Sequence, residues 1–320
     1  MPISKLYFAT DLHGSEKCYI KFLNAAKFYK VSTLILGGDI TGKVIVPIVK
    51  QPDGSHMAHF LDSDHVAKSE AELDQMITSI QTNGYYPYVT TEAEADELIA
   101  NKKKSDEVFN EQMIGQIKRW LKMAEERLKG TGVKVYITGG NDDRFEIEPV
   151  LKSSSFVTDA EGEVLEIDSN HEMISTGYGN KTPWNCPRDV SEEELAKRIE
   201  DMTSKVRRME NCIFNIHVPP VNTGIDEAPL LDTSVSPPKP VVKGGQVMKT
   251  GAGSRAVREA IEKSHPLLGL HGHIHESRGI FKIGRTTCLN PGSEYTEGTL
   301  HGVIVAFDEK SIKSHQLVSG

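Results

Sequence analysis

The chain has 320 residues, of which 38% are hydrophobic and 26% charged, and its formal net charge at pH 7 is -8. These values are typical of a soluble globular protein that buries a core, and no segment approaches the roughly 18 to 20 consecutive apolar residues of a membrane span. The acidic balance argues against duplex DNA or an anionic membrane as the main partner, because both attract basic surfaces.

Cysteine spacing and the N-terminal stretch bear on the compartment. Cys18, Cys186, Cys212 and Cys288 form no Cys-x-x-Cys pair, so the sequence predicts neither a disulfide framework nor a zinc ribbon. The first apolar stretch is too short for a signal peptide and leads directly into a candidate site residue, Asp11. We therefore expect a cytoplasmic protein that binds no membrane, and the sequence leaves its oligomeric state open.

A strand, a helix and a second strand are predicted first, at residues 5–10, 16–29 and 33–36. Ser15 stands where the helix needs an N-cap. Short connections make this a strand–helix–strand unit with parallel strands, and ligands bind beyond the carboxyl ends of such strands. Each strand ends in a carboxylate, so we expect Asp11 and Asp39 to share a site.

Residues 43–130 interrupt the alternation of strands and helices. A hairpin is predicted at 44–61, and Pro47 would confine its first strand to a sheet edge because proline has no N–H. Apolar periodicity then predicts three helices, over about 73–82, 92–104 and 113–128. We interpret 43–130 as an insertion into a single domain of residues 1–320, either a cap beside the site or extra helices that cover the sheet.

The alternation resumes with strands predicted at 133–138, 163–167, 172–176, 212–216 and 266–270, and with helices that begin after Ser191 and after the turn at 251–254. The Pro-, Gly-, Ser- and Thr-rich segment 221–249 is too long for an ordinary connection, which indicates a functional or mobile loop. Asn141 and His217 follow two of these strands, and His273 and His275 follow a third. Residues i and i+2 of extended backbone point to the same side, so both of these last imidazoles face one site.

Seven side chains at five strand ends have the chemistry of metal ligands: Asp11, His13, Asp39, Asn141, His217, His273 and His275. Taken singly, each has a simpler structural role as a helix cap, a turn residue or a hydrogen-bonded histidine. Together they form a mixed oxygen and nitrogen set that is large enough for two divalent cations, with one carboxylate left to bridge them.

The order of these motifs resembles that of the calcineurin-like metallophosphoesterase family, D-x-H, G-D, G-N-[HC]-[DE], H and G-H-x-H. The matching segments are Asp11-Leu12-His13, Gly38-Asp39, Gly140-Asn141, His217 and Gly272-His273-Ile274-His275, followed by Asn290-Pro291-Gly292-Ser293. The resemblance implies an α/β fold, a four-layer αββα sandwich of two mixed β-sheets flanked by helices. It also implies two metal ions that share Asp39, one held with Asp11, His13 and His275 and the other with Asn141, His217 and His273.

Hydrolysis of a phosphate ester is the activity that the resemblance implies, by attack of a hydroxide that bridges two cations roughly 3.5–4 Å apart. Asp39 and Asn141 would lie in this catalytic centre. One position departs from the family, because Asp142 stands where a histidine usually protonates the leaving group. An aspartate is ionised at pH 7 and is a poor general acid, so the role of Asp142 is open. The sequence does not show whether His171 or His265 replaces that histidine.

Other polar and aromatic residues have simple interpretations. Arg144, Lys181 and Arg188 are cations that would reach a substrate phosphate, but solvated surface is the simpler assignment for each. Trp184 would stack on a ring, although packing is the simpler role. The turn at 251–254 offers amides to a phosphate, with a helix cap as the simpler role.

We therefore predict a phosphoesterase with two divalent ions, for which Mn, Fe, Ni and Zn all fit nitrogen and oxygen ligands. Its substrate would be a small phosphorylated molecule, either a monoester or a diester. A metal-dependent nuclease is one alternative, which the acidic net charge disfavours. A metal-binding scaffold without turnover is another; Asp142 favours it and the complete ligand set disfavours it.

Overall fold

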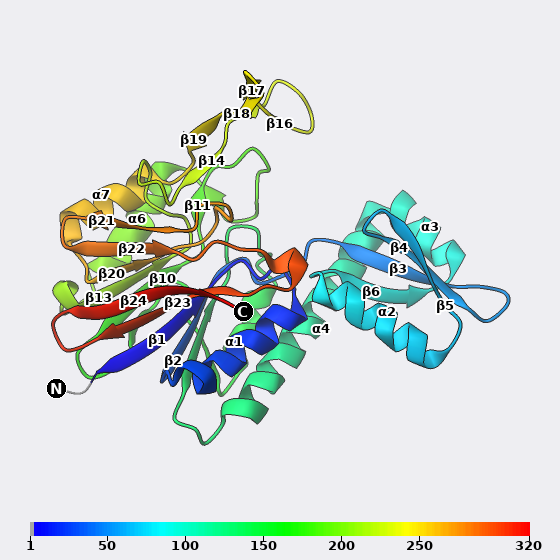
Figure 1. Ribbon diagram of the computed structural model, residues 1–320, viewed down its shortest axis with the longest axis horizontal. Coiled ribbons are helices and arrows are strands. Elements are labelled where there is room, and N and C mark those ends of the chain that lie inside the picture. The colour runs from blue at the N-terminus through cyan, green and yellow to red at the C-terminus, as the bar shows by residue number, and fades with distance from the viewer. Residues whose placement is uncertain (1–2) are drawn as a thin grey trace.

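Two six-stranded mixed sheets form the centre of the computed structural model, which describes residues 3–320 (Figure 1). The first sheet has the order β24 (Ile312–Ser319), β23 (His301–Phe307), β1 (Ser4–Ala9), β2 (Thr33–Gly37), β7 (Lys134–Thr138) and β8 (Val157–Asp159). The second has the order β21 (Gly279–Ile283), β22 (Thr286–Asn290), β20 (Leu268–Leu270), β13 (Cys212–Ile216), β10 (Glu172–Thr176) and β9 (Val164–Glu166). In each sheet four consecutive strands are parallel, and antiparallel strands complete it at the edges.

The sheets pack face to face because their strands alternate between two apolar faces. Leu6 and Phe8 of β1 belong to the core between the sheets, together with residues of β20 and β22. Tyr7 and Ala9 of the same strand point the other way, into a core shared with helices. This alternation is the period-2 pattern of a strand that is buried on both faces.

Helices cover the outer face of each sheet. The first sheet packs on α1 (Glu16–Tyr29), α4 (Lys102–Leu128) and α5 (Ile147–Lys152), and the second on α6 (Glu192–Thr203) and α7 (Arg255–Ser264). The layers are therefore helix, sheet, sheet and helix, and the predicted αββα sandwich is confirmed.

Local capping signals start the helices where the sequence places them. The side chains of Ser15, Thr91 and Ser191 accept hydrogen bonds from the backbone at the starts of α1, α3 (Glu92–Ala100) and α6. Ser254 caps α7 in the same way. The Glu192 carboxylate accepts from the amides of residues 255 and 256, and the Asp226 carboxylate accepts from that of Gly253. The turn at 251–254 is therefore a helix cap, and amides at this helix start already have anionic partners.

Residues 45–100 form a separate lobe that projects from the sandwich (Figure 1). Its four-stranded sheet has the order β5 (Ser63–Ala67), β4 (His56–Phe60), β3 (Ile45–Lys50) and β6 (Tyr86–Thr90), and α2 (Glu70–Thr82) and α3 pack beside it. The lobe has its own apolar cluster, centred on Ile48 and Ile80. The long helix α4 returns the chain to the sandwich, where Trp120 is buried in the main core.

The predicted hairpin is present as β3 and β4, but the sequence did not indicate β5 or β6. The expectation that Pro47 confines β3 to a sheet edge is wrong, because β3 lies between β4 and β6. The reason is local. The ladder between β3 and β4 includes only Val49 and Lys50, so at Pro47 the strand is paired with β6 alone.

Short ribbons complete the chain. Residues 227–251 form a projecting arm of three antiparallel ribbons, β14 (Glu227–Pro229) with β19 (Lys249–Gly251), β15 (Leu231–Asp232) with β16 (Lys239–Pro240), and β17 (Val242–Lys243) with β18 (Gln246–Val247) (Figure 1). The remaining elements are β11 (Gly179–Asn180), β12 (Asp189–Val190) and the 3-10 turns η1 (Met209–Asn211) and η2 (Tyr295–Glu297). Within residues 3–320, no helix combines the length and apolar character needed to cross a membrane.

Candidate metal centre and its cavity

The predicted ligands meet where the carboxyl ends of strands from both sheets come together. Backbone hydrogen bonds join the loops that carry them: the amide of Asp11 donates to the Gly38 carbonyl (2.9 Å), and that of His13 donates to the Asp39 carbonyl (2.9 Å). Across the two sheets, the amide of His273 lies 3.1 Å from Oδ2 of Asp11. The loops therefore form one hydrogen-bonded unit, and the ligands gather although they lie far apart in the sequence.

Two buried groups of side chains have their ligand atoms within 4.8 Å of one another. One is Asp11, His13 and His275, and the other is Asp39, His217 and His273. Asp39 links them, because its Oδ2 lies 3.4 Å from Nε2 of His217 and 3.8 Å from Nε2 of His13.

Asn141 joins the second group through its side-chain oxygen. Its Oδ1 lies 2.9 Å from Nδ1 of His273. The amide group Nδ2 donates to Asp189 at 2.9 Å, which turns Oδ1 towards the centre. All seven predicted ligands therefore lie in one place.

Hydrogen bonds fix the orientation of the histidines. Nδ1 of His217 lies 2.9 Å from the carbonyl oxygen of Gly37, to which only an N–H can donate, so Nε2 is the atom that faces the carboxylates. Asn290 donates to the carbonyls of Gly272 and Ile274 and so holds the loop that carries His273 and His275. Such outer hydrogen bonds set the geometry of metal ligands.

Backbone strain and close packing are concentrated here. Asp11, His13, Asp39 and His273 all have positive φ values, between 40° and 68°, a region that non-glycine residues seldom adopt. Gly140 has no room for a side chain, since a Cβ there would lie 2.1 Å from Oδ1 of Asp39. The surrounding fold holds the backbone in this conformation, and the ligands then lie within reach of one another.

Opposite charges shift the pKa values of the buried ligands. Burial alone would raise the pKa of Asp11, but the charge of His217 lowers it to about 2, and the pKa of Asp39 is lowered well below its ordinary value in the same way. Burial would lower the pKa of His217, yet Asp39 and Asp11 raise it to about 10. Burial lowers the pKa of His13 to about 3. The carboxylates and His13 are therefore in the protonation states that bind a metal, and His217 has a proton to release on binding.

The donor set fits divalent cations. Buried Nε2 of His217 has no hydrogen-bond partner, although two carboxylates lie 3.4 and 3.8 Å from it, beyond normal hydrogen-bond distance. Nε2 of His13 and Nε2 of His275 lie 3.1 Å apart, which brings two imidazole nitrogens to one point. Imidazole nitrogens and carboxylate oxygens are common ligands of divalent metal ions, and these buried clusters are consistent with a dinuclear metal site.

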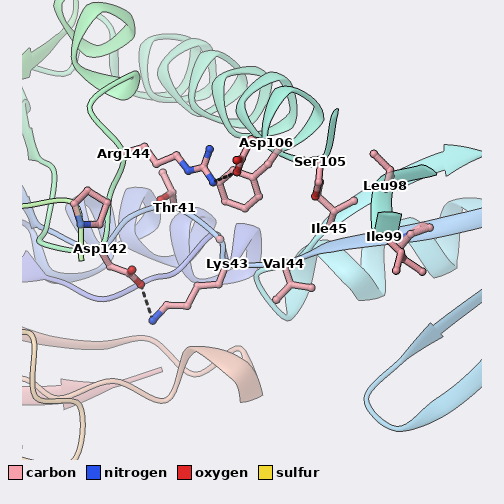
Figure 2. Close-up of a pocket in the computed structure, with 14 residues that line it drawn as sticks. Thr41, Lys43, Val44, Ile45, Leu98, Ile99, Ser105, Asp106, Asp142 and Arg144 are labelled. Atoms are coloured by element: carbon pink, nitrogen blue, oxygen red, sulfur yellow. Dashed lines mark hydrogen bonds and ion pairs between the residues drawn. The ribbon is translucent and has the colours of Figure 1, made fainter. Parts of the chain in front are cut away.

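Asp142, which replaces the usual histidine, lies beside the centre and pairs with a lysine. A carboxylate oxygen of Asp142 belongs to a further group with His13 and Asp39. Its Oδ2 is 2.7 Å from Nζ of Lys43, as Figure 2 shows. The position of the usual proton donor is therefore taken by an ion pair with a cation that the sequence did not indicate.

Two cavities adjoin this ion pair. One, of about 670 Å³, includes the ligands Asp39, Asn141, His273 and His275. The other, of about 650 Å³, lies between the sandwich and the lobe; its lining includes Thr41, Val44, Ile45, Leu98, Ile99, Asp106 and Arg144 (Figure 2). Lys43 and Asp142 line both cavities.

Several residues lie elsewhere than the sequence indicated. Arg188, expected on the solvated surface, is fully buried and pairs with Glu148 at 2.7 Å. Arg144 pairs with Asp106 at 2.8 Å instead of facing solvent freely. Trp184, expected to pack, is 65% exposed. These differences arise because exposure depends on which distant segments cover a residue.

Neither histidine considered as a substitute proton donor faces the ligands. His171 hydrogen-bonds Asp168 and packs on Phe307 in the core, and His265 ends α7 in a left-handed conformation. Two site residues were missed besides Lys43. Asp189 holds Asn141, and the Tyr295 ring lies 4.7 Å from that of His13. No sequence motif marks these three residues.

Comparison with known proteins agrees with this fold. No protein-family model matches the sequence. Uncharacterized protein MJ1162 of Methanocaldococcus jannaschii is 30% identical over 180 residues, which are 55% of this chain and 72% of that protein, so the two belong to one family. A solved crystal structure matches with a TM-score of 0.58 at 13% identity and covers 99% of both chains. The protein TT1561 of Thermus thermophilus matches with a TM-score of 0.50 at 11% identity, over 100% of this chain and 99% of that one. At these identities the solved structures establish the fold alone.

Proposed function

This chain belongs to the calcineurin-like metallophosphoesterase family, and from its site we propose that it hydrolyses phosphate esters with two divalent metal ions. The observation that carries the proposal is the pair of buried ligand groups linked by Asp39. Burying carboxylates and imidazoles together costs free energy unless cations or protons compensate, so a set of this kind points to bound metal.

Each ion would have its own ligands. Asp11, His13 and His275 would hold one, and His217, His273 and Asn141 the other, with Asp39 shared. When bound, such cations lower the pKa of a water molecule and neutralise charge on the phosphate.

Other groups of the chain orient the metal ligands. Asp189 directs the side-chain oxygen of Asn141 into the centre, and the Gly37 carbonyl fixes the ring of His217. Burial lowers the pKa of Lys43, but the Asp142 carboxylate raises it by more, so the ammonium group keeps its charge. Lys43 lines the cavity that contains the metal ligands, so its charge would stabilise negative charge that a phosphate oxygen or a departing alkoxide gains there. Lys43, held by Asp142, would then supply part of what the usual histidine provides.

Hydrolysis of activated substrates tests the proposal. Purified protein would be stripped of metal, reloaded with Mn(II), Ni(II) or Zn(II), and given p-nitrophenyl phosphate and bis(p-nitrophenyl) phosphate, with Asp39→Asn as the blank. Turnover that requires metal and is lost in the variant supports the phosphoesterase, and the ratio of the two rates separates monoester from diester preference. Absence of turnover in protein shown to hold two ions would support the metal-binding scaffold instead.

The nuclease alternative and the cellular location of the protein each need a separate measurement. Release of nucleotides from single-stranded DNA or RNA by the metal-loaded protein would favour the nuclease, against the acidic net charge of -8. All four cysteines are free, as expected in a reducing cytoplasm, and cell fractionation would test that location.

A further inference from the structure

The cavity that contains the metal ligands continues into a region of different chemistry. Its volume is about 670 Å³, and its ligand end carries Asp39, Asn141, His273 and His275. Away from that end, the lining includes a mainly apolar set, Pro183, Trp184, Ala228, Pro229, Leu231 and Pro240. A phosphate bound at the metal end would therefore place its organic group against apolar walls.

One wall is the loop between β11 and β12, which carries Trp184. The side chain is 65% exposed, whereas the other tryptophan, Trp120, is 1% exposed and stacks on Tyr19. Trp184 thus lines the cavity, and much of its large flat side chain is left uncovered. Ligand sites are commonly lined by such aromatic groups, with a few polar groups that fix orientation.

The Asp189 carboxylate links this loop to the metal centre. Asp189 accepts the hydrogen bond from Nδ2 of Asn141 at 2.9 Å through one oxygen. Its other oxygen accepts from the amides of Thr182 (2.9 Å) and Cys186 (3.0 Å), on either side of Trp184. These bonds hold the backbone on both sides of Trp184 at a defined place beside the metal ligands.

A second part of the lining comes from the projecting arm. Ala228, Pro229 and Leu231 come from β14 and β15. Nδ2 of Asn180, at the start of the loop, donates to the carbonyl of Ala252, the residue that follows the arm, at 3.4 Å. Both walls line the same cavity, and we call the part of the cavity that they line the slot.

We propose that this slot binds a flat aromatic ring in the organic part of the phosphate ester, with the ring stacked on Trp184. The proposal deepens the proposed function and rests on it. A strongly charged group fits less well, because Lys181 and Glu276 are the charged residues that line the cavity beyond the ligands and the Lys43–Asp142 pair, and they are of opposite sign. Nucleobases and simple aryl groups share the required flat face.

Binding of non-hydrolysable phosphonates tests the slot. Methylphosphonate, cyclohexylphosphonate, phenylphosphonate and the phosphonate analogue of adenosine 5′-phosphate would be titrated into Mn(II)-loaded protein, with tryptophan fluorescence as the readout. Trp120 is buried and contributes a constant background. Stacking on an aromatic side chain predicts that phenylphosphonate binds roughly 10-fold or more tightly than methylphosphonate, and more tightly than the similarly sized but non-planar cyclohexyl compound.

Variants separate stacking from general binding, with calorimetry as the readout where Trp184 is removed. Trp184→Ala should abolish the preference for phenylphosphonate, and Trp184→Phe should keep most of it. Phe28→Ala is the matched control, since Phe28 is 78% exposed on α1 and lies outside the cavity lining. If the adenosine phosphonate gains more affinity over methylphosphonate than phenylphosphonate does, the ring is identified as a nucleobase.

The outcomes distinguish this inference from the proposed function. Equal affinities for methyl- and phenylphosphonate, or a preference that survives Trp184→Ala, overturn the slot even if the protein hydrolyses phosphate esters. A preference for phenylphosphonate that depends on Trp184 supports the slot, because binding of a phosphonate needs no turnover. A failed hydrolysis assay would then count against the phosphoesterase activity alone.

Discussion

Replacing the shared carboxylate is the most direct test of the dinuclear centre. Asp39→Asn removes one negative charge with almost no change in size at a side chain that is 4% exposed. The amide of Asp142 donates to Oδ1 of Asp39 at 3.0 Å, and an asparagine oxygen still accepts that bond. We therefore expect the variant to fold and to lose metal affinity at both positions.

The size of the effect follows from linkage. Metal at 100 times its dissociation constant stabilises the native state by about 2.7 kcal/mol per site, so two sites contribute about 5 kcal/mol. For a chain of this length that amount raises the melting temperature by roughly 10 °C. Losing a carboxylate next to a buried dication lowers each affinity at least about 100-fold, which leaves only about 0.4 kcal/mol per site at the same metal concentration. The melting temperature should then rise by roughly 2 °C.

Thermal unfolding of metal-stripped protein with added Mn(II) measures the rise in melting temperature for the wild type and for Asp39→Asn. Elemental analysis gives the number of bound ions. Asp74→Asn is the matched control, because Asp74 is exposed on α2 of the lobe. A variant at Asp39 that keeps the wild-type thermal gain and two bound ions would refute the shared-ligand reasoning.

Three further changes have defined outcomes. Asp189→Asn should lower kcat/KM about 10- to 100-fold, since it weakens the bonds that hold Asn141 and the Trp184 loop; an unchanged kcat/KM would exclude this positioning role. Lys43→Met should lower kcat at least about 10-fold while elemental analysis still finds the wild-type metal content, and equal kcat values would remove Lys43 from the mechanism. Burial raises the pKa of Glu161 to about 7 from 4.5, so the native state keeps a proton that the unfolded chain releases. Stability should therefore fall by about 3 kcal/mol as pH rises from about 4.5 to 7 and level off above, and urea unfolding should show this fall in wild type but not in Glu161→Gln; parallel profiles would contradict it.

Local signals in the sequence predicted many of the individual strands and helices. Ser15 and Ser191 mark helix starts because a capping side chain bonds to backbone only a few residues away. Asp11 and Asp39 could be placed together because parallel strands of one unit end at the same edge of a sheet. His273 and His275 share a side for an equally local reason, the period of extended backbone.

These local signals could not predict contacts between segments that are far apart in the chain. Lys43 meets Asp142 across 99 positions, and Asn141 meets Asp189 across 48, so no spacing along the chain indicates either pair. The exposure of Trp184 is of the same kind, because it depends on which segments cover the ring.

The sequence by itself therefore determined many of the strands, the helix starts and the identity of the candidate ligands, since strand periods, caps and strand ends act over a few residues. The αββα arrangement was expected only from the resemblance of the motifs to a known family. Only the tertiary structure decided how the ligands are oriented, which cation faces Asp142, and what lines the cavity beyond the metals. The physical reason is that orientation and burial arise from packing between segments far apart in the chain, which local chemistry does not specify.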